Sequence, residues 1–396
     1  MAQYTIKKVF NFINFKDILN LIICVLVFPF AILAKIFIRD FWLVSEDENE
    51  ARDNGYHFFK WVKENRPKQK IAYAINKKSV DYLKVKNLGK IISYGSISHW
   101  FWYIVADKNI SSQKGGKPNA AVCYLFEVVL GFRKNNRVFL QHGITINKAE
   151  WLFYNNAKFR LFITATNDEH EYILNNFNYP TNNVKLCGFA RFDNLIDNVV
   201  DDNLILVMPS WRNWLGRESK ENKNQDFTES NYFKYWNSFL NSEKLDKLLK
   251  KHGKRILFYP HRNMQKFLSF FSTNSENVII ADWTKYDIQS LLKESKIMIT
   301  DYSSVFFDFS YMKKAVLFYQ FDEEEFRQKQ YDKGYFDYKD TPLAKWSSNE
   351  EDLINNLDEI LSTGCNFITD EQYHKIFPYH DKDNCYRIYT AIKEAK

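Results

Sequence analysis

From residue 41 onward, short apolar runs alternate with longer amphipathic stretches. The first series of runs is KIAYAI (70–75), KIISYG (90–95), RVFLQHG (137–143), LFITAT (161–166) and VKLCGF (184–189). The second is LILVMPS (204–210), RILFYPH (255–261), NVIIAD (277–282), KIMITD (296–301) and AVLFYQF (315–321). Runs without strict alternation suit strands that are buried on both faces of a parallel sheet. The pattern therefore predicts an α/β protein with two doubly wound halves.

Polar segments indicate how these halves are joined. Residues 193–203 separate the two series and are interpreted as a linker, while 217–230 is interpreted as a flexible loop. A length of 396 residues suits about two domains. We expect Rossmann-like domains at 40–195 and 196–380, preceded by a segment at 1–39 and followed by a helix at 381–396 that packs back across the boundary.

The segment at 1–39 contains one membrane-like stretch, ILNLIICVLVFPFAILA (18–34). Its 17 residues are at the lower limit for spanning a hydrocarbon core of about 30 Å, and Pro29 is expected to kink a helix. The flanking cations are Lys7, Lys8, Lys16, Lys35 and Arg39. They suit a segment that lies in an anionic leaflet, and we expect attachment through residues 17–39. A spanning helix and a buried first helix of a soluble domain are the alternatives.

Composition narrows the class of protein. Hydrophobic residues make up 45% and charged residues 26% of the chain, which excludes wholesale disorder and a polytopic membrane protein. A net charge of +7 favours an anionic partner without identifying it, and the basic residues are too dispersed to indicate nucleic-acid binding. The five cysteines and eight histidines show no metal-binding spacing, so we expect no structural metal and a reducing compartment.

Chemically useful residues follow several of the predicted strands. In VFLQHGIT, His142 precedes Gly143, where a tight turn would free the imidazole and leave the backbone amides of Gly143, Ile144 and Thr145 open to a ligand. A neutral imidazole at this position can take a proton from a hydroxyl near pH 7. The alternative is a histidine held by a backbone carbonyl for structural reasons.

In the second half, FYPHRNM places Pro260, His261 and Arg262 after an apolar run. A histidine beside an arginine at a strand end suits a pyrophosphate whose leaving phosphate gains charge. Arg262 can equally be an ordinary surface charge.

The segment ITDYSSVFFDFSYMKKAVLFY predicts a strand, a helix and another strand. Ser303 or Ser304 would cap that helix, whose free amides could bind a phosphate or a ribose. Asp308 would lie on the same helix face as Ser304 and accept hydrogen bonds from ligand hydroxyls. Asp301 and the serines alternatively serve only as structural caps.

Two arginines follow strands in the same way. VMPSWRNW places Ser210 and Arg212 just beyond the first strand of the second half, and GFARFDN supplies Arg191 near the boundary. A pair of arginines can clamp successive phosphates bidentately, which lysine cannot do.

Taken in order, these motifs resemble the CDP-glycerol glycerophosphotransferase family, which includes teichoic-acid primases and polymerases and related capsule enzymes. The resemblance covers FWLVSEDENEARDNGYHFFKWV (41–62), SYGSISHW (93–100), SSQKGG (111–116), FLQHGIT (139–145), GFARFD (188–193), PSWR (209–212), YPHRN (259–263) and TDYSSVFFDFSYMKKAVLFYQFDEEEF (300–326). It implies a GT-B fold, with acceptor and donor domains facing a central cleft, and a position on the cytoplasmic membrane face.

The resemblance also implies transfer of glycerol phosphate or ribitol phosphate from a CDP-polyol to a hydroxyl of a lipid-linked envelope polymer. His142 corresponds to the family's proposed base and His261 to its second histidine. The implied donor contacts are Arg191, Ser210, Tyr259, Pro260, Ser303, Ser304 and Asp308. We expect direct displacement at the β-phosphorus without a cofactor or metal, because positioning and electrostatics supply the catalysis.

Two alternatives remain at this point. A transferase of the same fold could use a nucleotide sugar, because a fold does not determine its substrate. A membrane-bound protein that binds a polymer without catalysis is the other alternative. The residues distinguish neither glycerol from ribitol, nor a primase from a polymerase, nor teichoic acid from capsule.

Overall fold

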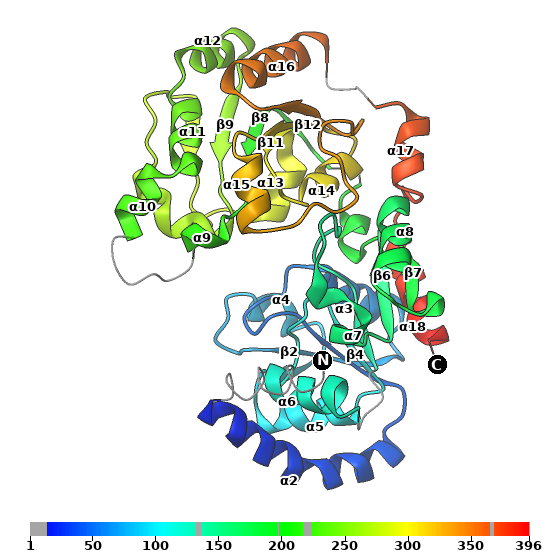
Figure 1. Ribbon diagram of the computed structural model, residues 1–396. Coiled ribbons are helices and arrows are strands. Elements are labelled where there is room, and N and C mark those ends of the chain that lie inside the picture. Colours follow the sequence, from blue (N-terminus) through cyan, green and yellow to red (C-terminus); the bar gives the residue numbers. More distant parts are fainter. Residues whose placement is uncertain (1–13, 132–135, 197, 217–222, 365–367, 396) are drawn as a thin grey trace. The chain divides into compact units, whose positions relative to one another are not determined.

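The structure is a computed structural model, and it describes residues 14–131, 136–196, 198–216, 223–364 and 368–395 (Figure 1). The chain divides into two compact units. The first contains the described residues up to Ile144, Glu150–Asn194, and those from Asp381 onward. The second contains Thr145–Ala149 and Leu195–His380.

The first unit is built on a parallel sheet of seven strands in the order β3-β2-β1-β4-β5-β6-β7. The strands are β1 (Phe41–Ser45), β2 (Lys70–Ile75), β3 (Lys90–Ser93), β4 (Lys108–Ser111), β5 (Arg137–Phe139), β6 (Leu161–Thr164) and β7 (Val184–Leu186). Its α-helices are α2 (Phe15–Phe37), α3 (Asn54–Asn65), α4 (Tyr82–Val85), α5 (Ile97–Val105), α6 (Ala120–Tyr124), α7 (Tyr154–Ala157), α8 (Asn167–Asn176) and α18 (Asn384–Glu394).

The apolar runs are continuous because both faces of this sheet are covered. In β1, Trp42 and Val44 pack into one core cluster with α3 and α18, while Phe41 and Leu43 pack into another with α5 and α2. Successive side chains of a strand point to opposite faces, so a strand that is covered on both sides needs apolar residues at every position.

The second unit has a six-stranded parallel sheet in the order β10-β9-β8-β11-β12-β13. The strands are β8 (Asp201–Val207), β9 (Arg255–Phe258), β10 (Val278–Ile280), β11 (Ser295–Thr300), β12 (Ala315–Tyr319) and β13 (Lys345–Ser347). Its α-helices are α9 (Asn213–Gly216), α10 (Lys223–Glu229), α11 (Asn231–Leu240), α12 (Glu243–His252), α13 (Ile288–Glu294), α14 (Phe306–Tyr311), α15 (Glu323–Lys329), α16 (Glu350–Thr363) and α17 (Asp370–Ile376).

Each of the ten apolar runs contains a strand, which confirms the α/β fold class, and several boundaries differ from the prediction. β8 begins at Asp201, so the segment interpreted as a linker ends earlier, because Asp201 already pairs with Ser295 of β11. The segment interpreted as a loop is helical over Lys223–Glu229, and its residues 217–222 lie outside the described residues.

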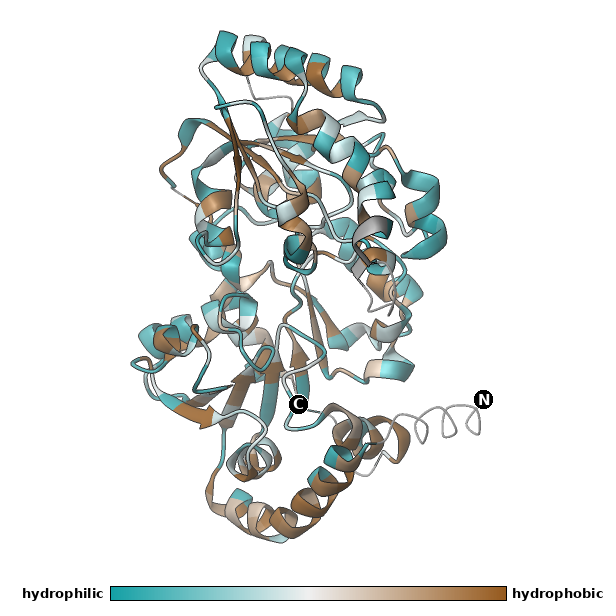
Figure 2. Ribbon diagram, turned by 90° about the vertical axis from the view of Figure 1, so that its left-hand side faces the viewer, coloured by the Kyte–Doolittle hydropathy of each residue, from teal (hydrophilic) through white to brown (hydrophobic). Residues whose placement is uncertain are grey.

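The apolar N-terminal stretch forms α2, a single helix that continues through Pro29. A capping box between Asn14 and Asp17 starts the helix. By length and composition, α2 is the one helix of the described chain that could cross a membrane. It packs against α5, and most of its residues are hydrophobic (Figures 1 and 2). Lys7 and Lys8 lie outside the described residues.

Candidate active site

Each sheet has one place where the strand order reverses. In the first unit this switch lies between β1 and β4, and in the second between β8 and β11. Open parallel sheets bind ligands beyond the carboxyl ends of the strands at such a switch. The motif SSQKGG (111–116) follows β4 in the first unit, whereas the segments after β8 and β11 contain Ser210 and Ser303 in the second.

Close packing at the first switch requires a glycine. Gly116 has a φ of 65°, and a β-carbon at this position would lie 2.5 Å from the hydroxyl of Ser111 and 2.8 Å from the carbonyl of Ser45. Any side chain would therefore push apart the ends of β1 and β4.

His142 does not follow its strand directly, because β5 ends at Phe139 and two residues intervene. The second of these, Gln141, has a φ of 61°, which a non-glycine residue adopts at a cost of about 1–2 kcal/mol. Its buried side chain donates hydrogen bonds to the carbonyl of Ile163 (2.7 Å) and the carboxylate of Glu169 (3.0 Å). These bonds hold the strained turn, after which the side chain of His142 is exposed.

Asn54, at the start of α3, connects this turn to Arg191. Its side-chain amide donates to the carbonyl of Gln141 (2.7 Å), and its oxygen accepts from the backbone N–H of Arg191 (3.1 Å). The guanidinium of Arg191 pairs with Asp53 at 2.9 Å and is only 5% exposed. Arg191 thus lies near His142 but is engaged by a carboxylate of its own unit.

The electrostatic surroundings of His142 favour its neutral form. Burial by the surrounding protein lowers the pKa of His142 below its ordinary value, and the positive charge of Arg191 lowers it further. A hydrogen bond with the backbone of Ser112 opposes this shift. Because His142 as a residue is exposed, water weakens the effect of burial, and the charge of Arg191 supports the same direction. A neutral imidazole can accept a proton.

The residues after His142 divide between the two units. Gly143 is half-buried and Ile144 is buried in the first unit, whereas Thr145, also buried, starts the five-residue segment that belongs to the second. In that segment, Asn147 accepts a hydrogen bond from Arg327 at 2.7 Å. The backbone amides proposed for ligand binding therefore lie where the chain passes between units.

In the second unit, Arg212 has a fully buried side chain between two carboxylates. Its guanidinium contacts Asp322 at 2.8 Å and 3.0 Å and Asp301 at 2.9 Å, and it donates to the hydroxyl of Ser210 at 3.0 Å. Burial lowers the pKa of Arg212, but the two carboxylates outweigh this effect and raise it. Arg212 is thus not placed to clamp a phosphate, because its donors already serve buried acceptors.

Asp301 and Ser210 belong to the same buried cluster. The carboxylate of Asp301 accepts from the backbone N–H of Ser210 (2.8 Å) and of Tyr302 (2.7 Å). Asp301 therefore ties the end of β11 to the end of β8, which is a structural role. The side chain of Ser210 is 7% exposed.

His261 lies beside this cluster, three residues after the end of β9 at Phe258. Its backbone N–H donates to the carbonyl of Pro209 (3.0 Å), and its ring stacks on Trp211 with centroids 6.2 Å apart. The Nδ1 atom accepts a hydrogen bond from the backbone N–H of Asn263 at 3.2 Å. In the neutral ring the proton consequently resides on Nε2, which can donate to a phosphate oxygen.

The neighbours of His261 in its motif have different surroundings. Tyr259 and Pro260 are buried, and the carbonyl of Pro260 accepts from Gln265 at 2.9 Å. Arg262 is exposed, with its guanidinium 4.6 Å from the ring centroid of Trp283. Of these three side chains, Arg262 is the one that reaches solvent.

The serines of DYSS do not occupy the N-cap as predicted. α14 starts at Phe306, so Val305 is the N-cap residue, and it makes no side-chain capping bond. Ser303 instead accepts from the backbone N–H of Val305 at 3.3 Å, in a turn that precedes the helix. Both serines are half-buried, and Asp308 lies in α14 and is 2% exposed.

No group of three or more potential metal-ligating His, Cys, Asp or Glu side chains is found among the described residues. Four of the five cysteines are described, and all four are buried and unbridged; Cys365 lies outside the described residues.

Comparison with known proteins identifies the family. The family model described as "CDP-Glycerol:Poly(glycerophosphate) glycerophosphotransferase" matches residues 31–394. The chain belongs to this family. The minor teichoic acid biosynthesis protein GgaB of Bacillus subtilis (strain 168) is 33% identical over 367 residues, which cover 89% of this chain and 39% of GgaB. The chain thus spans well under half the length of that relative.

Solved structures show the fold of this glycerophosphotransferase-family chain. The wall teichoic acid polymerase TagF has a TM-score of 0.64 at 15% identity, with 91% of this chain and 90% of the TagF chain covered. The UDP-GlcNAc 2-epimerase of Methanocaldococcus jannaschii, in complex with UDP-GlcNAc and UDP, has a TM-score of 0.54 at 12% identity, covering 89% and 99%. The fold is therefore GT-B-like, as the sequence predicted.

In this glycerophosphotransferase-family chain, sequence reasoning missed the residues that hold the candidate base. These are Asn54, Gln141 and Asp53, which lie far apart in the sequence and meet only in the folded unit. Gln141 offered a weak signal, because it precedes His142 at the end of an apolar run. Asp53 and Asn54 resemble ordinary residues at the start of a helix.

Proposed function

We propose that this chain transfers glycerol phosphate or ribitol phosphate from a CDP-polyol to a hydroxyl of a cell-envelope polymer, with release of CMP. The family match over residues 31–394 is the observation that carries the proposal. The geometry adds a solvent-exposed, neutral histidine beyond one sheet and a histidine with an Nε2 donor beyond the other.

In the proposed reaction, His142 removes the proton from the acceptor hydroxyl as its oxygen attacks the β-phosphorus. The bond between that phosphorus and the oxygen bridging to the α-phosphate breaks, so CMP leaves with that oxygen. His142 suits the role because a lowered pKa keeps the imidazole unprotonated near neutral pH.

We assign His261 to the donor phosphates. Its tautomer, fixed by the bond to Asn263, leaves an N–H on Nε2 that can donate to a phosphate oxygen of the donor. This hydrogen bond becomes stronger as negative charge develops on the leaving CMP. Ser303 and Ser304 are half-buried and are proposed to contact the donor, whereas the predicted contact of Asp308 is not retained because Asp308 is buried in α14. The mechanism requires both histidines to reach one donor molecule, and closure of the units on binding is the means we propose.

The buried arginines support this chemistry indirectly. Arg191 carries a positive charge near His142, and Arg212 holds the ends of β8 and β11 through Asp301. We propose that positioning and electrostatics suffice, so that neither a metal nor a cofactor is required.

The acceptor and the location are also proposals. GgaB is a teichoic acid biosynthesis protein and TagF is a wall teichoic acid polymerase, so we propose a teichoic-acid-like acceptor. We further propose that this acceptor polymer is linked to a lipid. The apolar outer surface of α2 supports attachment to the cytoplasmic membrane face.

Donor profiling tests the function. The purified protein is incubated with an acceptor polymer and either CDP-glycerol, CDP-ribitol or a set of UDP-sugars, with and without a chelator, and the released nucleotide is identified. We expect CMP from a CDP-polyol, with or without the chelator. UDP release would instead support a sugar transferase, and no turnover with any donor would support a non-catalytic binding protein.

A further inference from the structure

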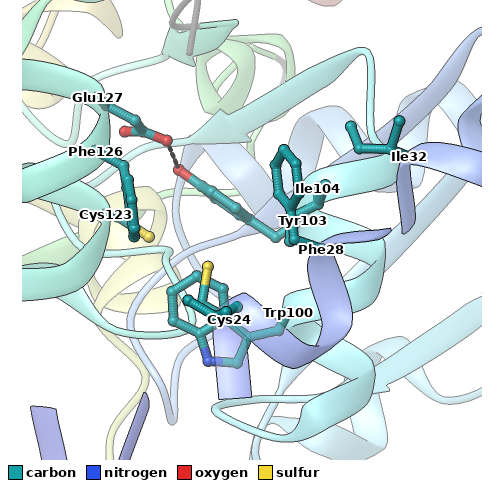
Figure 3. Close-up of a pocket in the computed structure, with 10 residues that line it drawn as sticks. Cys24, Phe28, Ile32, Trp100, Tyr103, Ile104, Cys123, Phe126 and Glu127 are labelled. Carbon is teal, nitrogen blue, oxygen red and sulfur yellow. Dashed lines mark hydrogen bonds between the residues drawn. The ribbon is translucent and has the colours of Figure 1, made fainter. Parts of the chain in front are cut away.

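A cavity of about 500 Å³ lies within the first unit, between α2, α5 and the segment that begins with α6 (Figure 3). Its walls include Cys24, Phe28 and Ile32 of α2, Trp100 and Ile104 of α5, and Phe126. The volume lies within the roughly 300–1,000 Å³ typical of ligand pockets. None of the residues assigned to the reaction lines this cavity.

The cavity is continuous with an apolar surface that has no protein partner in the described chain. Most large apolar side chains of α2 are exposed, and Leu26, Phe30 and Phe37 are 64%, 70% and 78% exposed. Single exposed apolar residues are common, but a contiguous surface of this kind marks a contact with protein or membrane. Val25 and Ile32 line the cavity and are themselves partly exposed, so they lie at its opening.

Polar contacts fix the orientation of α2. Asn20, a polar residue near the start of its apolar sequence, is buried and accepts a hydrogen bond from the indole N–H of Trp100 at 2.9 Å. This face is therefore held against α5 and cannot turn toward lipid. Lys16 and Arg39 lie exposed near the two ends of α2, where cations favour the anionic headgroups of a bilayer surface.

At the polar end of the cavity, the carboxylate of Glu127 is paired with the ammonium of Lys117. Glu127 lies in a π-helical turn (Leu125–Val129) and accepts a hydrogen bond from the hydroxyl of Tyr103 at 2.6 Å (Figure 3). Its other oxygen is 3.5 Å from the ammonium of Lys117, and burial lowers the pKa of Lys117 to about 8. A charged ligand would disturb this buried pair, whereas an uncharged hydrocarbon would not.

We propose that the cavity binds one acyl chain of a bilayer phospholipid, whose anionic headgroup remains at the surface near the ends of α2. The acyl chain would enter between α2 and α5 and displace water from the aromatic and aliphatic side chains that line the cavity. α2 would then be more than a surface anchor, because a lipid taken from the bilayer would fill the space behind it.

Photo-crosslinking tests the proposal with the whole 396-residue chain. Vesicles of phosphatidylethanolamine and phosphatidylglycerol carry a phosphatidylglycerol with a diazirine at the end of one acyl chain, and labelled residues are mapped by mass spectrometry. We expect labels on Trp100, Tyr103, Ile104 or Phe126, inside the cavity. Labels confined to the outer residues of α2 would overturn the proposal, since they report bilayer contact alone.

Neighbouring positions on α2 provide matched variants. Val25→Trp adds bulk at the cavity opening, while Leu26→Trp adds the same bulk to the adjacent exposed position outside the cavity. We expect Val25→Trp to reduce cavity labels about tenfold and Leu26→Trp to preserve them, with equal vesicle binding in flotation. Ile32→Trp and Leu33→Trp repeat the comparison if either variant of the first pair fails to fold. Equal labelling within both pairs would contradict the proposal.

A competition experiment distinguishes the source of the hydrocarbon. A long-chain polyprenyl phosphate and unlabelled phosphatidylglycerol are each added to the crosslinking mixture. We expect phosphatidylglycerol to reduce the cavity labels at the lower concentration. Displacement by the polyprenyl phosphate at a lower concentration would overturn the phospholipid assignment.

Discussion

In the first unit, the segment after β5 turns the side chain of His142 out to solvent, whereas in the second unit the segment after β8 turns Arg212 into the protein. Both residues follow a buried parallel strand at the same edge of their sheet. The first is held through its backbone by Gln141 and Asn54, and the second through its own charge by Asp301 and Asp322. A polar residue beyond a strand can therefore serve chemistry or architecture, and its partners decide which.

The largest expected effect is on the rate of catalysis, and it should follow from changing His142. His142→Ala should lower the transfer rate about 10²- to 10⁴-fold, the usual contribution of a general base, with only a small change in melting temperature, because the residue is exposed and loses one hydrogen bond with the backbone of Ser112. Steady-state CMP release measures the rate. His374→Ala, at an exposed histidine of α17, is the control and should retain full activity. A His142→Ala enzyme within a few-fold of the unaltered protein would remove His142 from the mechanism.

Arg212 should show the opposite behaviour, with its main effect on stability. Arg212→Met leaves Asp301 and Asp322 buried without their cation, which should cost about 3–5 kcal/mol in the free energy of unfolding, measured by denaturant titration.

The exposed pair Arg255–Asp201, at 2.6 Å in the same unit, provides the control for Arg212. Arg255→Met should cost less than about 1 kcal/mol, since water already solvates both charges. Similar losses in the two variants would show that burial does not distinguish these pairs.

The charge of Arg191 should be visible in the pH dependence. Activity requires neutral His142 and so rises with pH through the pKa of this residue, which is lowered from its ordinary value by burial and by Arg191. Arg191→Gln removes a positive charge and leaves Asp53 negative, and both changes raise that pKa. The acid limb of the kcat/KM pH profile should therefore move to higher pH. A limb that stays in place or moves to lower pH would contradict the assignment of His142 as the base whose pKa Arg191 lowers.

The smallest effects are expected at the serines before α14. Ser303→Ala removes the hydrogen bond to the backbone of Val305 and should cost about 0.5–1.5 kcal/mol in the free energy of unfolding. Ser304→Ala should raise the KM for the CDP-polyol while leaving stability unchanged. Thermal unfolding and donor titration separate the two effects, and an unaltered KM in Ser304→Ala would argue against donor binding there.

Ten of the thirteen strands in the described residues were predicted, because coverage of both sheet faces leaves short apolar runs with polar residues at their ends. The strands β1, β4 and β13 were not predicted. The partners of those end residues were not predictable. Arg212 meets Asp322 across 110 positions, and Asn54 meets Gln141 across 87. An arginine after a strand has the same local pattern whether it points to solvent or into the core. The capping role of Ser303 or Ser304 was wrong because α14 starts later than the polar pattern indicated.

Transfer of the polyol phosphate is tested by following the β-phosphorus itself. CDP-glycerol labelled at that phosphorus is incubated with the protein and an acceptor polymer, and the label is traced in the products. We expect label in the polymer and unlabelled CMP, because the bond between the two phosphates of the donor breaks. Labelled CDP together with unphosphorylated glycerol on the polymer would contradict this expectation, as would the absence of any turnover.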